Sequence, residues 1–498
     1  MKKTSNSIVS NTKEKRKNKL SKWKVSATVF ALLCSSMFLV NDKHIVAEEP
    51  NYQGVSFETG AYQHDAPAPY GFNYSQNSQY ASTNTNKVNW MYSIPGTDGI
   101  QQFWGKPAID KDGTVYMNNQ NKYMYAFNQD GSVKWKIKTD GGNEKTNIIG
   151  SDGTIYNASR KLYAINPDGT EKWVAKPTSS DLNQQNFSEP AIDKDGTIYM
   201  LNDTQYDEKL YAFNPDGTLK FKGTTDLSKF GTTVRHENGM LIGKNGYMYV
   251  LMERASLKYV VALDKNGNKV WSKEFSGDKF YYAMDHKGDL FVTLQGSRSK
   301  VYKLNGATGE TLVEKTYDTR TVYAPIVDYA TGDSYISLNN QITKFDNDLN
   351  ELWKKTIYSA PTEVAIDKNR DIIFSDNDGV YKLNKDGEQI WKLDNKTIQT
   401  LKFDNKTISD GVIVPGYYNP AIDKEGKVYL SFHSSSKSTM FYSLISIGDP
   451  VEQPIDFCSY YGSLEKKLND KTLTKEEQTK AIEKTEKLLD QLKSYSAE

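Results

Sequence analysis

Nine aromatic and cationic residues have side chains that could bind a ligand. Each stands in a stretch of variable sequence at or just ahead of an apolar, strand-like segment. Aromatic rings stack on sugars and cations, and Arg binds carboxylates and other anions. The set therefore predicts recognition of a carbohydrate, a peptide or an anionic group, with the bland alternative that these side chains only fill space. The nine residues are Trp104, Phe187, Arg235, His236, Tyr281, Arg320, Tyr323, Tyr417 and Tyr418.

Reaction chemistry is harder to find in this sequence. The five histidines show no paired spacing typical of zinc ligands, so no metal site is predicted. The sequence contains neither a Gly-rich phosphate loop nor a serine nucleophile elbow. A lyase or hydrolase site built from Arg235, His236 and Arg320 stays open as an alternative, because such a site depends on convergence in space. No catalytic residue is assigned.

Two short acidic segments begin like calcium-binding loops. Residues 110–113 and 193–196 both read Asp-Lys-Asp-Gly, which opens like an EF-hand loop. The twelfth positions are Asn121 and Thr204, where that loop requires a bidentate Glu. These segments are therefore interpreted as turns, with shallow calcium binding as a minor alternative.

A two-part phrase recurs eight times at a period of about forty residues. Residues 107–116 (PAIDKDGTVY) show its first part, and residues 123–135 (YMYAFNQDGSVKW) show the second. Asp-Gly and Asn-Gly between apolar runs predict hairpins, so each unit should form four short strands. Several strands are apolar on both faces, which indicates sheets covered on both sides. A unit this short must stack on its neighbours.

The phrase LYAxNPDGTxKW resembles the repeat of the pyrroloquinoline-quinone-like (PQQ-like) β-propellers. The resemblance implies an all-β, eight-bladed β-propeller of four-stranded antiparallel blades over residues 88–449. In that family a Trp near the outer strand packs between adjacent blades, and Phe221 and Val313 depart from this pattern. The matching residues are Trp135, Trp173, Trp271, Trp353 and Trp391.

The eighth repeat is incomplete, because its final Trp-bearing strand is replaced by residues 448–450 (GDP). Residues 88–94 (VNWMYSI) have the character of the missing strand. We expect them to pair with the last blade, which would close the ring and remove exposed sheet edges. The alternative is that Trp90 belongs to a flexible leader.

The two ends of the chain differ from the repeats. Residues 1–47 combine a basic region, an apolar core and a small-residue site, which predicts an export signal. A retained membrane anchor and lipid attachment are the alternatives. Residues 48–87 are rich in Tyr, Asn, Gln and Ser and are expected to be a disordered spacer. Residues 450–498 are expected to form a short helical tail, with Thr474 and Glu477 as a capping box.

Charge and cysteine content limit the partners. The whole chain carries a formal charge of +1, but removing residues 1–47 takes away ten basic and two acidic side chains and leaves about −7. A mildly acidic chain argues against nucleic acid and, after signal cleavage, against a membrane surface. Only Cys34 and Cys458 occur, so the mature chain would contain no internal disulfide.

Two classes of function compete. The first is an exported, non-enzymatic binding or scaffolding protein at the cell surface, which presents its variable loops to a protein or carbohydrate partner. The tail helix could add an oligomer or partner contact. The second class is a propeller enzyme: a lyase or hydrolase or, by the resemblance, a quinone-dependent dehydrogenase. Those dehydrogenases add a vicinal Cys pair that this sequence lacks, so neither PQQ nor calcium is expected.

Overall fold

The computed structural model describes residues 77–449 with gaps, and Thr474. The gaps are at residues 79, 96–101, 140–145, 176–186, 194, 203–207, 234–238, 321, 329–330, 360–363, 404–405, 408–412, 416–419 and 437–438. All described residues except Thr474 belong to one compact unit, Tyr52–Val451. The expected signal peptide and, apart from Thr474, the expected helical tail therefore lie outside the described residues.

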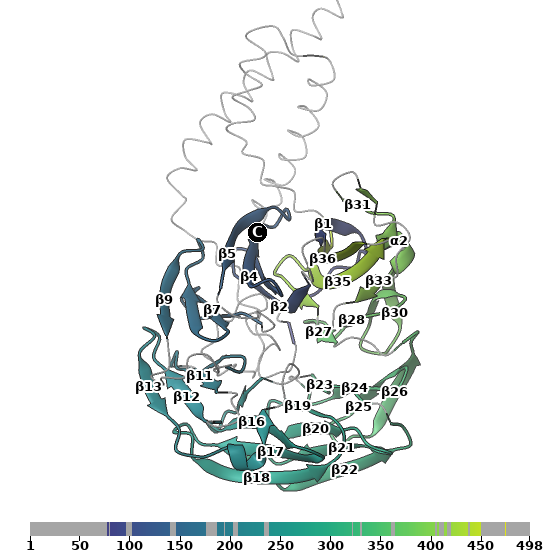
Figure 1. The fold of residues 1–498 in the computed structure, drawn as a ribbon. Coiled ribbons are helices and arrows are strands. Elements are labelled where there is room, and N and C mark those ends of the chain that lie inside the picture. Colours follow the sequence, from purple (N-terminus) through teal and green to yellow (C-terminus); the bar gives the residue numbers. More distant parts are fainter. Residues whose placement is uncertain are drawn as a thin grey trace, which may run out of the picture. The chain divides into compact units, whose positions relative to one another are not determined.

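Eight antiparallel sheets follow one another around a common centre (Figure 1), which confirms the predicted eight-bladed propeller. Blade 1 contains β2 (Phe103–Ile109), β3 (Val115–Asn119), β4 (Tyr123–Phe127) and β5 (Val133–Lys138). Blade 2 contains β6 (Ile148–Ile149), β7 (Ile155–Ala158), β8 (Leu162–Ile165) and β9 (Glu171–Ala175). Blade 3 contains β10 (Ala191–Ile192), β11 (Ile198–Leu201), β12 (Leu210–Phe213) and β13 (Leu219–Lys222). Blade 4 contains β15 (Leu241–Ile242), β16 (Met248–Arg254), β17 (Leu257–Leu263) and β18 (Lys269–Ser276), with β14 (Thr232–Thr233) also paired to β16.

The second half of the ring repeats this plan. Blade 5 contains β19 (Phe280–Met284), β20 (Leu290–Leu294), β21 (Ser299–Leu304) and β22 (Thr311–Tyr317). Blade 6 contains β23 (Ile326–Val327), β24 (Ser334–Leu338), β25 (Gln341–Phe345) and β26 (Glu351–Thr356). Blade 7 contains β27 (Ala365–Ile366), β28 (Ile372–Asp376), β29 (Gly379–Leu383) and β30 (Gln389–Asp394). Blade 8 contains β34 (Ala421–Ile422), β35 (Val428–Ser436) and β36 (Thr439–Ile447), with β33 (Ile413–Pro415) also paired to β35.

The fourth strand of blade 8 comes from the other end of the described chain. Strand β1 (Val88–Pro95) pairs antiparallel with β36, from Val88 opposite Ile447 to Pro95 opposite Phe441. The indole ring of Trp90, in β1, stacks on Phe127 of blade 1, at 6.1 Å between ring centroids. Segment 88–94 is thus the outer strand of the last blade, where the sequence placed it.

The acidic segments are hairpin turns whose carboxylates accept hydrogen bonds from groups of the same hairpin. Asp110 Oδ1 accepts the backbone N–H groups of Asp112 and Thr114, and its Oδ2 accepts the hydroxyl of Tyr116 at 2.8 Å. Asp423 makes the same pair of contacts with the N–H of Lys427 and the hydroxyl of Tyr429. Among the residues that the structure describes, no cluster of His, Cys, Asp or Glu could hold a metal ion.

Neighbouring blades are joined by a repeated contact between an indole and a glycine. Trp135 of blade 1 donates its Nε1–H to the carbonyl of Pro167 in the β8–β9 turn of blade 2, at 3.0 Å. In that turn Gly169 has φ +89° and lies so close that an added Cβ would be 2.8 Å from the ring. The same arrangement joins Trp90 to Gly131, Trp173 to Gly217, Trp271 to Gly309 and Trp353 to Gly387.

The junction between blades 5 and 6 lacks both partners of this contact. Val313 stands where other blades have Trp, and Leu349 stands where the next turn has Gly. Leu349 keeps the left-handed backbone of the glycine, with φ +59°, and is 2% exposed in a cluster against which Val313 packs. The leucine fills the space that an indole occupies elsewhere, so the two departures from the repeat are coupled.

Residues 77–87 correct one expectation. The sequence predicts that they end a disordered spacer, but Asn77, Ser78 and residues 80–87 lie against blades 6, 7 and 8. The segment has few aliphatic side chains; Tyr80 packs against the apolar cluster of blades 7 and 8, and the other contacts are mainly polar. Ser82 donates its N–H and its hydroxyl to Asp367 Oδ2 at 2.8 and 2.7 Å, and Asn77 Nδ2 donates to the carbonyl of Val327. Composition alone does not register such contacts.

We predict that Gly169→Ala destabilises the protein more than Gly288→Ala does. Both glycines have φ +89°, but nothing lies within 4 Å of a Cβ added at Gly288. The backbone cost of about 1–2 kcal/mol is therefore common to both variants. The indole of Trp135 should add about 1–3 kcal/mol at Gly169 through overpacking. Midpoints of urea unfolding measure the difference, and equal losses would refute the role given to the indole contact.

We further predict that Val313→Trp and Leu349→Gly are each destabilising alone and partly compensate each other together. The introduced indole needs the space that Leu349 fills, and removing the leucine alone leaves a gap beside Val313. A double-mutant cycle in urea should give a favourable coupling of about 1 kcal/mol or more. Additive effects of the two substitutions would show that the two positions are independent.

Candidate functional site

The two faces of the ring differ in how their connections are built. The turns between first and second strands and between third and fourth strands lie on one face, here called the turn face. The other connections lie on the opposite face, here called the loop face. The connection between β30 and β34 is an insertion that contains α2 (Asn395–Gln399) and the hairpin β31–β32 (Lys402–Phe403 and Lys406–Thr407). Variable loops on a regular scaffold are the usual place for binding.

Loops of blades 5 and 6 are fixed to each other on the loop face. Gln295, which follows β20, donates its Nε2–H to the carbonyl of Val322 at 2.8 Å. Thr293 of β20 donates its hydroxyl to the carbonyl of Tyr323 at 2.9 Å. The N–H of Tyr323 in turn donates to the carbonyl of Ser337 in β24. These bonds hold the segment that precedes β23 against two rigid strands.

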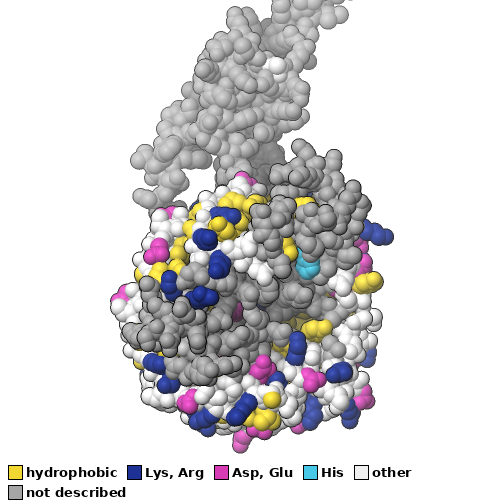
Figure 2. Space-filling model, in the orientation of Figure 1, with side chains coloured by type: hydrophobic (Ala, Val, Ile, Leu, Met, Phe, Trp, Pro, Cys, Tyr) yellow, Lys and Arg dark blue, Asp and Glu magenta, His cyan; other side chains and the backbone are white. Residues whose placement is uncertain are grey.

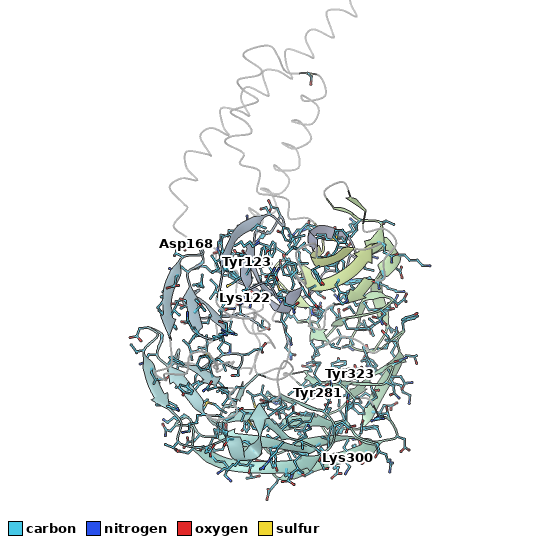
Figure 3. The ribbon with its side chains drawn as sticks, in the orientation of Figure 1. Lys122, Tyr123, Asp168, Tyr281, Lys300 and Tyr323 are labelled. Atoms are coloured by element: carbon cyan, nitrogen blue, oxygen red, sulfur yellow. The ribbon has the colours of Figure 1, made fainter. Side chains whose placement is uncertain are left out.

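Three of the nine predicted site residues lie in the segments that form this junction. Tyr281 of β19 is directly opposite Thr293 in the sheet register, and Thr293 contacts the backbone of Tyr323. Figure 3 shows Tyr281 and Tyr323 on the inner side of the neighbouring blades 5 and 6. Arg320 is exposed, and its Nη2 is 3.8 Å from Asp278 Oδ2. Tyr281 is only 6% exposed, so Tyr323 and Arg320 are the more accessible members.

The remaining six predicted residues do not form this group. Trp104 lies on β2 opposite Asn118, and its side chain is outside the described part. Phe187 is fully buried in this structure and packs edge-on against Tyr211, at 5.9 Å between centroids, so it belongs to the core and not to the exposed surface of the loop face. The other four, Arg235, His236, Tyr417 and Tyr418, lie outside the described residues.

Two tyrosines of the loop face escaped the sequence analysis. Tyr358 follows β26 and is 69% exposed. Tyr123 begins β4, and the Nζ atoms of Lys136 and Lys138 lie 3.9 and 6.0 Å from the centre of its ring. Tyr123 belongs to the repeated phrase, which made it look structural. Tyr358 lies in a short connection outside the repeated phrase. Its position just after an outer strand that contains a Trp is the one sequence feature that would have placed it on the loop face.

The loop that carries Tyr358 is held by a buried carboxylate. Asp376 Oδ2 accepts the N–H of Tyr358 at 3.0 Å, and Asp376 Oδ1 accepts the N–H of Asp378 at 2.8 Å. Burial raises the pKa of Asp376 above its ordinary value, against the opposing effect of these backbone donors. The exposed ring of Tyr358 is thus presented on a fixed backbone.

The chemistry available on the described loop face is that of recognition. It offers tyrosine rings with hydroxyl groups, lysine ammonium groups and the Arg320–Asp278 pair. Figure 2 shows basic and acidic side chains interspersed on the face in view, without a broad field of one sign. Such a surface can stack, donate hydrogen bonds and pair with single charges, as protein interfaces do. None of the helices in the described part of the chain has the length and apolar character needed to cross a bilayer.

Comparison with known proteins places these observations in a family. Protein YxaL of Bacillus subtilis, described as uncharacterized, is 40% identical over 79 residues, which span 16% of this chain and 18% of that protein. The quinohemoprotein alcohol dehydrogenase of Comamonas testosteroni has a TM-score of 0.54 at 12% identity, covering 78% of this chain and 81% of that one. A europium-containing methanol dehydrogenase has the same TM-score at 10% identity, covering 80% and 98%. At these identities the dehydrogenases show a common fold alone.

The family model described as outer membrane protein assembly factor BamB matches residues 79–250 and 257–393. The match covers more than half of the chain and includes blades 1 to 7. The repeated blades, the indole contacts and this match lead to one conclusion: the chain belongs to the BamB-like family of PQQ-like β-propellers.

Proposed function

We propose that this protein is an exported, non-enzymatic binding and scaffolding module that presents its loop face to a protein partner at the cell surface. The observation that carries the proposal is the group of exposed side chains on blades 5 to 7. Arg320 and Tyr358 are exposed there, on loops that the strands hold by hydrogen bonds. Tyr and Arg are the residue types enriched at the energetic centres of protein interfaces.

Family membership supports the same function. The matching model is named for an assembly factor, which is a role in organising other proteins. Export follows from the signal-like residues 1–47 and remains part of the proposal. A carbohydrate ligand is the second occupant that the tyrosines would suit, and the experiment below separates it from a protein.

The dehydrogenase fold raises the question of whether a quinone would fit. The chain's two cysteines, Cys34 and Cys458, are far from vicinal. Asn77 and Ser78 pair with Ile366 on the inner edge of blade 7, so the chain's own segment occupies part of the ring centre. The residues present therefore do not fit the quinone site that the family resemblance describes, and we assign no step to such a group.

We predict that the double variant Arg320→Ala/Tyr358→Ala binds its partner at least about tenfold more weakly than the unaltered mature protein. The loss reflects the removal of an exposed charge and an exposed ring from the loop face. Capture from a cell-envelope extract identifies the partner, and biolayer interferometry with the purified partner measures the dissociation constant. The matched control is Lys385→Ala/Asp386→Ala, an exposed pair on the turn face.

Three results would contradict the proposal. One is equal binding by the loop-face variant and the turn-face control. Another is retention of polysaccharide without any protein, which would favour the carbohydrate alternative. The third is loss of binding only when residues 450–498 are deleted, which would assign recognition to the tail. Melting temperatures of all variants must agree for these comparisons to hold.

A further inference from the structure

Asn77, Ser78 and residues 80–87, which precede β1, are called the strap; they follow a path from the inner edge of the ring to its outer edge. Asn77 forms a parallel bridge with Ile366 of β27, and the N–H of Ser78 donates to the carbonyl of Ile366 at 2.7 Å. The other edge of β27 is paired with β28. Asn77 and Ser78 therefore lie on the inner edge of blade 7, joined to it by this single parallel bridge.

The strap then crosses the turn face below blades 7 and 8. The N–H of Lys368, in the first turn of blade 7, donates to the carbonyl of Tyr80 at 3.0 Å. Ser82 is 5% exposed and donates twice to the buried Asp367. The N–H of Thr83 donates to the carbonyl of Gly426, in the first turn of blade 8, at 2.7 Å. Backbone groups and one small hydroxyl supply most of these contacts.

At its outer end the strap replaces a missing turn. Blade 8 takes its fourth strand from β1 and so has no turn between its third and fourth strands. Trp391 of blade 7 instead donates its Nε1–H to the carbonyl of Thr83 at 2.9 Å. In the preceding junction Trp353 donates to the carbonyl of Lys385, which belongs to a regular turn. The strap carbonyl thus takes the position of a turn carbonyl.

The strap also supplies hydrogen-bond acceptors to a buried cation. Lys382 is fully buried, and its Nζ lies 3.1 Å from Asp371 Oδ2 and 3.4 Å from Asp367 Oδ2. Nζ also donates to the carbonyl of Ser82 at 2.9 Å and to Asn84 Oδ1 at 3.0 Å. An ammonium group out of water needs all its donors satisfied. Nζ further donates to the carbonyl of Thr83 at 3.4 Å, so without the strap Lys382 would lose three of its acceptors.

We propose that the surface under the strap is a peptide-binding site, and that the strap is its ligand within the same molecule. The site consists of the inner edge of β27 together with Asp367, Lys382, Trp391 and the carbonyl of Gly426. It recognises an extended, polar peptide through backbone pairing, as in binding by β-strand addition. A small hydroxyl at the Ser82 position gives selectivity, because Asp367 is buried and accepts from it. The bound strap keeps the site closed, and displacing it opens the site to an equivalent segment of a second copy of this chain.

The test supplies the strap as a separate peptide. In the full chain, residues 77–86 are replaced by a Gly sequence of equal length with Pro at positions 78, 82 and 83, which keeps β1 attached but removes the N–H and hydroxyl groups by which the ligand donates. A fluorescein-labelled peptide of residues 76–87 (QNSQYASTNTNK) is then titrated, and its anisotropy is measured. The replaced protein should bind it at least about tenfold more tightly than the unaltered protein, whose site is filled in cis. The matched control is the same peptide with Ser82→Val, which should bind at least about tenfold more weakly, since Asp367 then lacks its hydroxyl donor.

A second variant decides the matter if the replaced chain does not fold. Ser82→Val in the otherwise unaltered chain weakens the strap without removing it. Its melting temperature should fall relative to the unaltered protein and rise again when the unlabelled peptide is added. Equal binding of the two peptides, no binding to the replaced protein, or no rise in the melting temperature of Ser82→Val would each overturn the proposal.

Discussion

The contact between a tryptophan and the glycine of the next turn is the interaction on which the ring depends. At five junctions, those of Trp90, Trp135, Trp173, Trp271 and Trp353, it joins a blade to its successor through one hydrogen bond to a turn carbonyl and one close approach of a ring to a backbone. The glycine is required twice, for its positive φ and for the absence of a Cβ. Because every blade must meet its neighbour at a fixed angle, this small unit sets the geometry of the whole circle. The junction of Val313 and Leu349 has neither partner, whereas the junction of Phe221 lacks the indole but keeps the turn glycine, Gly267.

Blades 1 to 3 and blades 5 to 7 use different polar contacts. In blades 5 to 7 a buried lysine of the third strand approaches an aspartate at the start of the second strand, as Lys382 does with Asp371. Blades 1 to 3 have alanine in place of that lysine, and a lysine of the fourth strand approaches a threonine, as Lys172 does with Thr154 at 2.8 Å. The buried lysines also reach carbonyls of the following blade, such as Lys344 to Lys385. The lysines of blades 5 and 6 therefore reach across the blade junctions, whereas those of blades 1 to 3 make their threonine contacts within a blade.

Local signals predicted the fold, and the candidate site depends on contacts that such signals do not contain. Each hairpin is encoded within about a dozen residues by its turn and its apolar strands, so eight repetitions made the architecture readable. The variable sequence around Phe187 favours a ligand-binding role, but it contains no sign that the ring is buried against Tyr211. The polar composition of the strap predicts disorder. In the structure, residues nearly three hundred positions away in the sequence bind the strap and hold it in place. No window of sequence shows that Ser82 meets Asp367.

The ring closes at a seam, where β1 pairs with β36. Its two strands are the earliest and the latest described parts of the propeller to leave the ribosome, with Val88 opposite Ile447. Contacts between such distant positions are slow to form, because a long loop must close before they give any return. The circle can therefore be completed only after translation of nearly the entire chain. In a molecule built in this way, the outer strand of blade 8 is synthesised first and waits for its partner until the last strand arrives.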